Sequence, residues 1–293
     1  MNYKIPYPHK KILLVGSSGY IGSFLSEKIS PFYNLVTVDV LKSKCTNTVA
    51  DGFHLDKDFL NSFDGLIMLA GMSRVADCKA NPNDCYRLNT ELPLHLRKNL
   101  QSDKFFIYAS SGSLYNGSDS FPASENFEIN KSDNAYDKSK LLLDQRMQLQ
   151  KKPFVSLRFG TVNGFTSYWR RELIINQMCY DAVSQNKLSL RNGMSWRAIL
   201  DIEDLGRAIL KLLSRIDYSQ KIYNLSSFNS RIGLIANRVQ KITGCTIIDE
   251  KEANQTYSFS MDCSLFIKDH NFEFKSQIDT LIQNIVGQLN EGL

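Results

Sequence analysis

Long hydrophobic runs are missing from this sequence of 293 residues. No apolar stretch approaches the roughly 20 residues that a transmembrane helix needs, and the first 11 residues lack the apolar core of a secretion signal. Lysine and arginine are scattered along the chain, and the formal net charge is only +5. The sequence therefore predicts a cytoplasmic protein, with neither a membrane nor nucleic acid among its partners.

Cysteine and histidine are also scarce, with six and four residues respectively. No CxxC pair occurs and the histidines lie far apart, so we expect no metal site. In a chain without a secretion signal, the cysteines are expected to be reduced and mostly buried thiols.

What the chain does contain is an alternation of short apolar runs with segments of helical periodicity. Strands are predicted at 11–18, 35–40, 47–51, 65–71, 104–110 and 154–160, and helices at 20–30, 83–100 (with a bend at Pro93) and 134–150. Continuous apolar strands separated by helices indicate a parallel sheet covered on both faces. We therefore predict an α/β fold with a doubly wound, Rossmann-like parallel sheet, whose ligands bind beyond the carboxyl ends of the strands.

A glycine-rich turn follows the first predicted strand. The stretch "VGSSGYIGS" places Gly16, Gly19 and Gly22 between that strand and the first helix. Glycines there allow a tight turn and a close approach of the backbone to a pyrophosphate at the helix N-terminus. The spacing is GxxGxxG rather than GxGxxG, but its position between a strand and a helix favours a nucleotide-binding turn. The candidate cofactor contacts in this turn are Gly16, Ser18, Gly19, Tyr20, Ile21 and Gly22.

An acidic residue, Asp39, ends the second predicted strand. A carboxylate there accepts hydrogen bonds from ribose hydroxyls and repels a 2′-phosphate, so it favours NAD over NADP. The alternative is an aspartate that only caps the next turn, and Lys42 and Lys44 lie close enough in sequence to reach a 2′-phosphate instead.

After about residue 164 the alternation becomes less regular. Helices are predicted at 172–186 and 203–214, with short strands near 188–190, 197–202 and 221–225. We predict an NAD-binding domain over residues 1–164. A smaller, mainly substrate-binding lobe is predicted over 165–293, with some segments returning to the sheet.

A tyrosine stands four residues before a lysine at the start of the helix predicted over 134–150. Tyr136 and Lys140 share one helix face, and an ammonium group beside a phenol lowers the pKa of the phenol. The pair is a candidate acid/base, although the same spacing also suits a tyrosine packed along a lysine stem. The fifth strand ends in Ser110, Ser111 and Ser113, whose hydroxyls can bond a sugar oxygen or simply form a serine-rich loop.

In their order, these motifs resemble the extended short-chain dehydrogenase/reductase family, in particular its NAD-dependent nucleotide-sugar epimerases and dehydratases. The likeness rests on the glycine turn, Asp39, "LAG" (69–71), "SSGSLY" (110–115) and Tyr136-x-x-x-Lys140. It continues in "LRFGTVNG" (157–164), "WRAILDIEDLGRAI" (196–209) and "YNLSS" (223–227). The resemblance therefore covers the chain from about residue 11 to the C-terminal helix.

The resemblance implies a role for each candidate residue. Tyr136 would exchange a proton with the sugar, Lys140 would bind the nicotinamide ribose and lower the pKa of the tyrosine, and Ser111 would bond the same sugar oxygen. The further cofactor-binding residues that it implies are Asp51, Leu69, Ala70 and Gly71, beside Tyr136 and Lys140 themselves. The implied substrate-binding residues are Ser73, Ser111, Ser113, Asn176, Arg191 and Arg197.

Departures from the family pattern narrow the expected reaction. Members that dehydrate sugars carry Asp-Glu directly after the catalytic Thr, where this chain has Gly112 and Ser113. Members that epimerise next to a ketone carry Cys at the position of Ser113. We therefore expect an NAD-dependent nucleotide-sugar 4-epimerase that works through a transient 4-keto sugar. The alternatives are a 4-keto reductase and a non-catalytic nucleotide-binding regulator. The helices at 83–100 and 134–150 are expected to form a homodimer.

Overall fold

The computed structural model describes residues 10–118, 122–129, 134–215, 220–250 and 256–292. The chain divides into two compact units, each made of separate segments. Unit 1 comprises residues 1–114, 128–158 and 209–223, and unit 2 comprises residues 115–127, 159–208 and 224–293. Residues 1–9, which precede the first strand, lie outside the described residues.

The larger sheet has seven strands in the order β10-β6-β5-β4-β1-β2-β3. Its strands are β1 (Lys11–Val15), β2 (Asn34–Asp39), β3 (Thr48–Val49), β4 (Gly65–Met68), β5 (Phe105–Ser111), β6 (Phe154–Phe159) and β10 (Gln220–Leu225). β1 pairs in parallel with both β2 and β4. The strand order therefore reverses between β1 and β4, which is where such sheets bind ligands. The doubly wound parallel sheet is confirmed.

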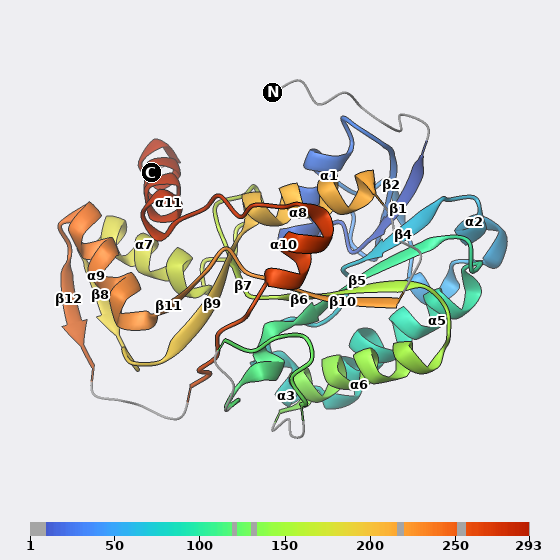
Figure 1. The fold of residues 1–293 in the computed structure, drawn as a ribbon. Helices are drawn as coiled ribbons and strands as arrows, with labels where there is room; N and C mark the ends of the chain where they lie inside the picture. Colours follow the sequence, from blue (N-terminus) through green and yellow to red (C-terminus); the bar gives the residue numbers. More distant parts are fainter. Residues whose placement is uncertain (1–9, 119–121, 130–133, 216–219, 251–255, 293) are drawn as a thin grey trace. The chain divides into compact units, whose positions relative to one another are not determined.

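Helices cover both faces of this sheet. α1 (Tyr20–Ile29) lies on one face, and α5 (Leu92–Asn99) and α6 (Ala135–Leu149) lie on the other (Figure 1). Leu96 of α5 and Leu143 of α6 are fully buried in one apolar cluster with Leu66 and Phe106 of the strands. This packing holds α6 against β5. The shorter helices of unit 1 are η1 (Gly52–His54), α2 (Lys57–Asn61) and α3 (Val75–Ala80).

The helix predicted over 83–100 is present as a helical run over residues 82–99 that consists of three segments. α4 (Pro82–Tyr86), the π-helical segment η2 (Arg87–Glu91) and α5 follow one another directly. Pro93 has no N–H with which to bond the residue four positions earlier, and just before it the N–H of Leu92 donates to the carbonyl oxygen of Arg87, five positions earlier. The expected irregularity therefore appears as a π-helical turn just before the proline. The sequence analysis did not predict α3.

Unit 2 contains two small sheets. The first has the order β11-β9-β7 and the second pairs β12 with β8. The strands are β7 (Thr161–Asn163), β8 (Lys187–Leu190), β9 (Trp196–Asp201), β11 (Phe228–Arg231) and β12 (Thr246–Asp249). Three helices, α7 (Ile174–Gln185), α9 (Ile232–Thr243) and α11 (Ile278–Gly292), contribute to one buried core that includes Ile175, Ile235 and Ile285. The remaining helices are η3 (Gly112–Tyr115), α8 (Ile202–Ser214) and α10 (Ser264–His270). Within the described part of the chain, no helix is both long enough and apolar enough to span a membrane.

The expectation that all six cysteines are reduced is wrong for two of them. Cys78 in α3 and Cys85 in α4 form a disulfide, and their Cα atoms lie 5.0 Å apart. The two short helices bring these residues within the range that a disulfide requires, which a rule based on compartment does not address. The free thiols are Cys45, which is half-buried, and the buried Cys179, Cys245 and Cys263.

Candidate active site

The glycine-rich turn joins β1 to α1 at the carboxyl end of the sheet. Gly16 has a φ of +99°, and a Cβ at this position would collide with the backbone of Ala70. A Cβ on Gly22 would collide with the carbonyl oxygen of Gly16. α1 begins after Gly19, which offers no side-chain cap to the first N–H groups of the helix. The turn therefore leaves backbone donors at a helix N-terminus, which fits the pyrophosphate of a dinucleotide.

Asp39 lies against this turn at the end of β2. Its carboxylate accepts hydrogen bonds from the backbone N–H of Ser18 at 2.9 Å and of Leu41 at 3.0 Å. The hydroxyl of Ser18 in turn lies 2.9 Å from that of Thr46. Asp39 thus caps the following turn and contacts the glycine turn, and its contact with the ribose of a dinucleotide stays a prediction. Of the two other residues proposed in this turn, Tyr20 is buried and Ile21 is half-buried in the first turn of α1.

The segment after β4 is attached to β1. The N–H groups of Leu69 and Ala70 donate to the carbonyl oxygen of Val15, at 2.8 and 3.0 Å. This keeps the proposed cofactor residues at 69–71 next to the glycine turn, across the point where the strand order reverses. Ser73, proposed to bind substrate, follows on an exposed part of the same segment.

Asp51 follows β3 and begins η1. Its carboxylate accepts the N–H of Phe53 at 3.0 Å and forms an ion pair with Arg87 at 3.5 Å. The first contact caps η1 and the second joins Asp51 to the π-helical segment that contains Arg87, so its role in cofactor binding stays a prediction.

α6 presents Tyr136 and Lys140 at its N-terminal end. The helix is started by Asn134, whose side chain accepts the N–H of Asp137 at 2.9 Å. Lys140 is buried, and its ammonium group donates to the carbonyl oxygen of Ala109 in β5 at 2.8 Å. Burial lowers the pKa of Lys140 to about 8, while the negative charge of Asp144 opposes that shift. Lys140 therefore reaches the end of β5, the strand that carries Ser111.

Asp144 is a site residue that the sequence analysis missed. Its buried carboxylate accepts four hydrogen bonds, which attach α6 to β5 and β6. The donors are Tyr108 (2.9 Å), Ser110 (3.1 Å), Ser156 (2.8 Å) and Arg158 (3.0 Å). Burial, and then the nearby Asp144 carboxylate, raise the pKa of Tyr108 well above its ordinary value. Asp144 lies one turn beyond Lys140, so extending the same helix face in the sequence would have identified it.

Ser111 belongs to a hydrogen-bonded chain that ends on α6. Its hydroxyl lies 2.7 Å from the hydroxyl of Ser113, and Ser113 donates to the carboxylate of Asp137 at 2.5 Å. The second oxygen of Asp137 accepts the side-chain amide of Asn134 at 2.6 Å. Unit 1 thus brings the proposed Ser111 and Ser113 together with the first turn of the helix that carries Tyr136.

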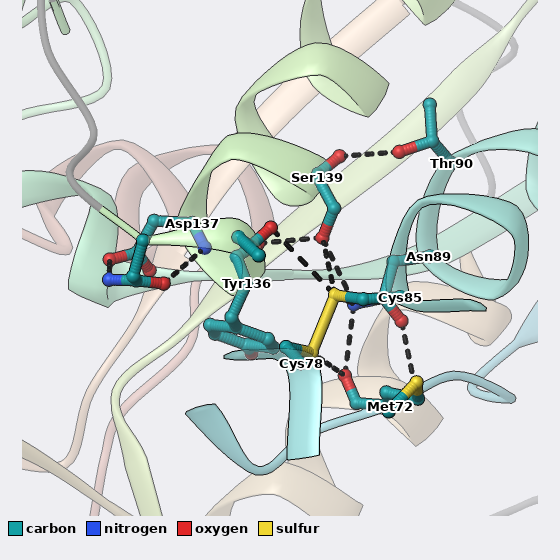
Figure 2. The surroundings of a disulfide bond; sticks show 10 residues. Met72, Cys78, Cys85, Asn89, Thr90, Tyr136, Asp137 and Ser139 are labelled. Atoms are coloured by element: carbon teal, nitrogen blue, oxygen red, sulfur yellow. Dashed lines mark hydrogen bonds between the residues drawn. A yellow bond between two sulfur atoms is a disulfide. The ribbon is translucent and has the colours of Figure 1, made fainter. Parts of the chain in front are cut away.

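A second side of α6 contacts the disulfide (Figure 2). Sγ of Cys85 lies 3.6 Å from the hydroxyl of Ser139. The side-chain amide of Asn89 donates to Ser139 at 3.0 Å and to the carbonyl oxygen of Met72 at 2.9 Å. Asn89 therefore connects α6 to the segment that follows β4, and no sequence motif indicated this connection.

Three of the proposed substrate-binding residues lie in unit 2, where each has different surroundings. Asn176 of α7 is fully buried, and its side chain accepts the N–H of Gly164 at 3.0 Å and donates to the carbonyl oxygen of Arg170 at 2.9 Å. It therefore supports the loop between β7 and α7.

The two arginines differ in exposure. Arg197 of β9 is 9% exposed and donates to the hydroxyl of Thr256 at 2.8 Å, and burial lowers its pKa to about 10. Arg191 is exposed and forms an ion pair with Glu250. A buried arginine that retains its charge is the stronger candidate for a phosphate ligand, because its desolvation strengthens the interaction with an anion.

Comparison with known proteins places these features in context. The sequence pattern of the NAD dependent epimerase/dehydratase family matches residues 12–226. The UDP-glucose 4-epimerase of Thermotoga maritima is 18% identical, with 96% of this chain and 99% of that chain covered and a TM-score of 0.84. The ADP-L-glycero-D-manno-heptose-6-epimerase of Helicobacter pylori is 20% identical, with coverages of 99% and 98% and a TM-score of 0.85. TunA, an NAD-dependent NDP-hexosamine 5,6-dehydratase of tunicamycin biosynthesis, is 17% identical, with coverages of 96% and 98% and a TM-score of 0.85. At these identities the structural likeness establishes the fold.

Proposed function

The chain belongs to the NAD-dependent epimerase/dehydratase family, and from this premise we propose that it is a nucleotide-sugar 4-epimerase that works through a transient 4-keto sugar. It is an enzyme of the extended short-chain dehydrogenase/reductase type, and its cofactor is NAD, as in the family. Bound NAD would supply the acceptor and then the donor for the hydride exchanged at C4 of the sugar. The glycine turn, Asp39 and Lys140 are the residues that would hold it.

Tyr136 is proposed to take the proton of the C4 hydroxyl and later to return it. Lys140 shares its helix face one turn away, and a buried ammonium group with a pKa of about 8 remains largely charged at neutral pH. That positive charge favours the phenolate form of a neighbouring tyrosine. Ser111 would bond the same sugar oxygen from the end of β5.

The observation that carries the choice of 4-epimerase is the composition of the site beside Ser111. The chain has Ser111, Tyr136 and Lys140, but Gly112 and Ser113 occupy the positions of the dehydratase Asp-Glu pair. A single carboxylate, Asp137, contacts Ser113 there. One carboxylate does not replace the separate acid and base that elimination of water needs, whereas transient oxidation at one carbon needs only one group that takes the hydroxyl proton and returns it, the role proposed for Tyr136.

Two alternatives use the same residues differently. A 4-keto nucleotide-sugar reductase needs the same serine, tyrosine and lysine, and differs only in consuming the reduced cofactor. A non-catalytic nucleotide-binding regulator would not need these three side chains, so their presence argues against it.

We also propose that residues 165–293 mainly serve the nucleotide sugar, with Arg197 and Arg191 on its phosphates, Asn176 in its site and Ser73 and Ser113 near the sugar. A homodimer formed through α4, α5 and α6 is part of the proposal, and light scattering at micromolar concentration tests it.

A cytoplasmic location also stays a prediction. The Cys78–Cys85 disulfide is the observation that opposes it, because disulfides are rare in reducing compartments.

The test uses UDP-glucose or UDP-N-acetylglucosamine with deuterium at C4, and it measures where the deuterium is found in the product and how much NADH is consumed. An epimerase returns the deuterium to C4 of the inverted sugar with no net change in NADH, whereas a reductase consumes one NADH for each product formed. Tyr136→Phe should lower turnover by about 10²–10⁴-fold, the usual contribution of a positioned acid/base, while binding persists. Tyr33→Phe is the matched control, because Tyr33 is a buried tyrosine that directly precedes β2, at the end of that strand away from Asp39. Unchanged turnover in Tyr136→Phe would rule out the proposed role of the tyrosine.

A further inference from the structure

The hydrogen-bonded chain that begins at Ser111 ends on a buried carboxylate, and we propose that it is a proton relay from the substrate hydroxyl to Asp137. This inference rests on the proposed function and deepens it, because it gives Ser113 and Asp137 a part in the proton transfer. Asp137 is only 4% exposed. The hydroxyl oxygen of Ser111 lies 2.7 Å from that of Ser113, which in turn lies 2.5 Å from a carboxylate oxygen of Asp137.

The direction of each hydrogen bond follows from the number of protons on each group. An ionised carboxylate only accepts, so Ser113 donates its single hydroxyl proton to Asp137. Ser111 must then donate its own proton to Ser113. The oxygen of Ser111 also accepts the backbone N–H of Ser113 at 3.2 Å. What Ser111 can offer to a ligand is therefore its remaining lone pair, which accepts a hydrogen bond from a sugar hydroxyl.

The far end of the relay is oriented as well. The side-chain oxygen of Asn134 accepts the backbone N–H of Asp137 at 2.9 Å, so the side-chain nitrogen of Asn134 is the atom that donates to Asp137. One carboxylate oxygen thus faces a fixed donor, and the other faces Ser113. The same contacts form a reciprocal cap at the start of α6, so the experiment has to separate a capping role from a relay.

Proton transfer along this chain is balanced. The O–H bond of the substrate breaks as its proton bonds to Ser111, the former proton of Ser111 bonds to Ser113, and that of Ser113 bonds to Asp137. Three O–H bonds break and three form, and the carboxylate becomes neutral. The electron pair left on the sugar oxygen forms the carbonyl as the hydride leaves C4. Every hydrogen bond is then reversed, so that Ser111 donates to the carbonyl oxygen, and reduction restores the first arrangement. Tyr136 is the other acceptor for the same single proton, so in one turnover the proton goes either to the tyrosine or to Ser111, and only the second route leaves Asp137 neutral.

Asp137→Asn is the decisive variant. Because Asn134 donates to one side of residue 137, the new amide oxygen should face Asn134 and the new NH₂ group should face Ser113. The cap is retained, but the amide cannot accept a proton. Its NH₂ group should donate to Ser113, so that Ser113 donates to Ser111 and the direction of both hydrogen bonds is permanently reversed. Ser113→Ala interrupts the chain, and Ser113→Thr retains the hydroxyl. Asp103→Asn, which removes an exposed carboxylate from unit 1, is the control.

The first measurement needs no substrate. Neutron diffraction from crystals exchanged into D₂O should show the deuterium of Ser111 directed to Ser113 and that of Ser113 directed to Asp137. In Asp137→Asn both should point the opposite way. A deuterium of Ser113 directed away from Asp137 in the unmodified protein, or the same directions in both proteins, would overturn the relay.

The second measurement uses UDP-glucose with NAD and follows turnover in mixtures of H₂O and D₂O. Several protons in transit should give a curved dependence of kcat on the deuterium fraction, and a single proton should give a straight line. Asp137→Asn and Ser113→Ala should lower kcat by about 10²-fold, with little change in KM, and should make the dependence of kcat on the deuterium fraction linear. Ser113→Thr should keep both the kcat and the curvature of the unmodified protein. Lower thermal stability with unchanged kcat and curvature would assign Asp137 to capping alone. If the unmodified protein turns over no nucleotide sugar, the proposed function fails, and the neutron result still decides the relay.

Discussion

Replacing Lys140 with methionine should make the protein more stable at neutral pH, although the variant loses a proposed catalytic residue. Burial lowers the pKa of Lys140 from 10.5 to about 8, and a difference of this size corresponds to about 3 kcal/mol. The unfolded chain holds the proton more tightly than the folded one. Below about pH 8 both states are charged, so the folded state carries the full cost, and above about pH 10.5 both are neutral and the cost disappears.

The expected net change follows from two opposing contributions. Methionine is unbranched and apolar, so it fills the space of the lysine stem without a buried charge. The variant loses the hydrogen bond to the carbonyl oxygen of Ala109, which contributes roughly 1 kcal/mol. Lys140→Met should therefore raise the free energy of unfolding by about 2 kcal/mol at neutral pH. The gain should shrink as the pH rises and become a loss of about 1 kcal/mol near pH 10.5.

Urea denaturation of the protein without cofactor measures this effect. Because other groups also titrate at high pH, the informative quantity is the difference between the variant and the unmodified protein at each pH. Lys138→Met, which removes an exposed lysine from the same helix, should show no pH-dependent difference. A Lys140→Met variant that is less stable at neutral pH, or a difference that does not change with pH, would refute the reasoning.

Three further predictions concern cofactor choice, the buried network and the disulfide. Asp39→Ala should narrow the preference for NAD over NADP in binding titrations, and a tenfold preference of the unmodified protein for NADPH, ~1.4 kcal/mol, would contradict the role of Asp39. Asp144→Ala should lower the free energy of unfolding, measured by urea denaturation, by about 3–5 kcal/mol, because it leaves Arg158 buried without its counter-charge. A loss below about 1 kcal/mol would show that solvent replaces the carboxylate. Replacing Cys78 and Cys85 together with alanine should cost about 2.5 kcal/mol, the value expected for so short a loop, and dithiothreitol should then shift the midpoint of the unmodified protein but not of the variant.

The sheet and the glycine turn were predictable because their signals are local. Central strands of the large sheet such as β1 and β4 are short, buried apolar runs, and Gly16 and Gly22 are needed by contacts within the first β–α turn and with the segment that follows β4. The start of α6 was predictable for the same reason, since Asn134 is a good cap and Tyr136 and Lys140 are one turn apart. Local preference and tertiary packing agree at these positions.

The connections between strands and α6 were not predictable in the same way. The partners of Asp144 come from β5 and β6, and the partner of Asp137 is separated from it by the loop after β5. These contacts depend on the register of a helix against a sheet, which no short stretch of sequence determines. The disulfide was missed because the prediction relied on compartment, whereas the pairing depends on how two short helices meet.

The division of the chain is another feature that long-range pairing determines. From the change in periodicity, the boundary is predicted at residue 164, with some segments of 165–293 expected to return to the sheet. In the structure, residues 115–127 and 159–164 belong to unit 2, and residues 209–223 belong to unit 1. The reason for the second exchange is visible in the sheet, because β10 adds to its edge beside β6.

Three successive turns of α6 contact the end of β5 or the η3 turn that directly follows it, and this arrangement explains how a buried lysine is tolerated beside the proposed catalytic serine. Asp137 contacts Ser113, Lys140 contacts Ala109, and Asp144 accepts Ser110. Asp144 has two effects at once, since it fixes the helix to the strand and its charge opposes the lowering of the lysine pKa. Without that carboxylate, the pKa of Lys140 should fall further below its ordinary value, and less of the cation would remain at neutral pH to favour the phenolate of the tyrosine. The residue that anchors the helix is therefore also one that keeps its lysine charged.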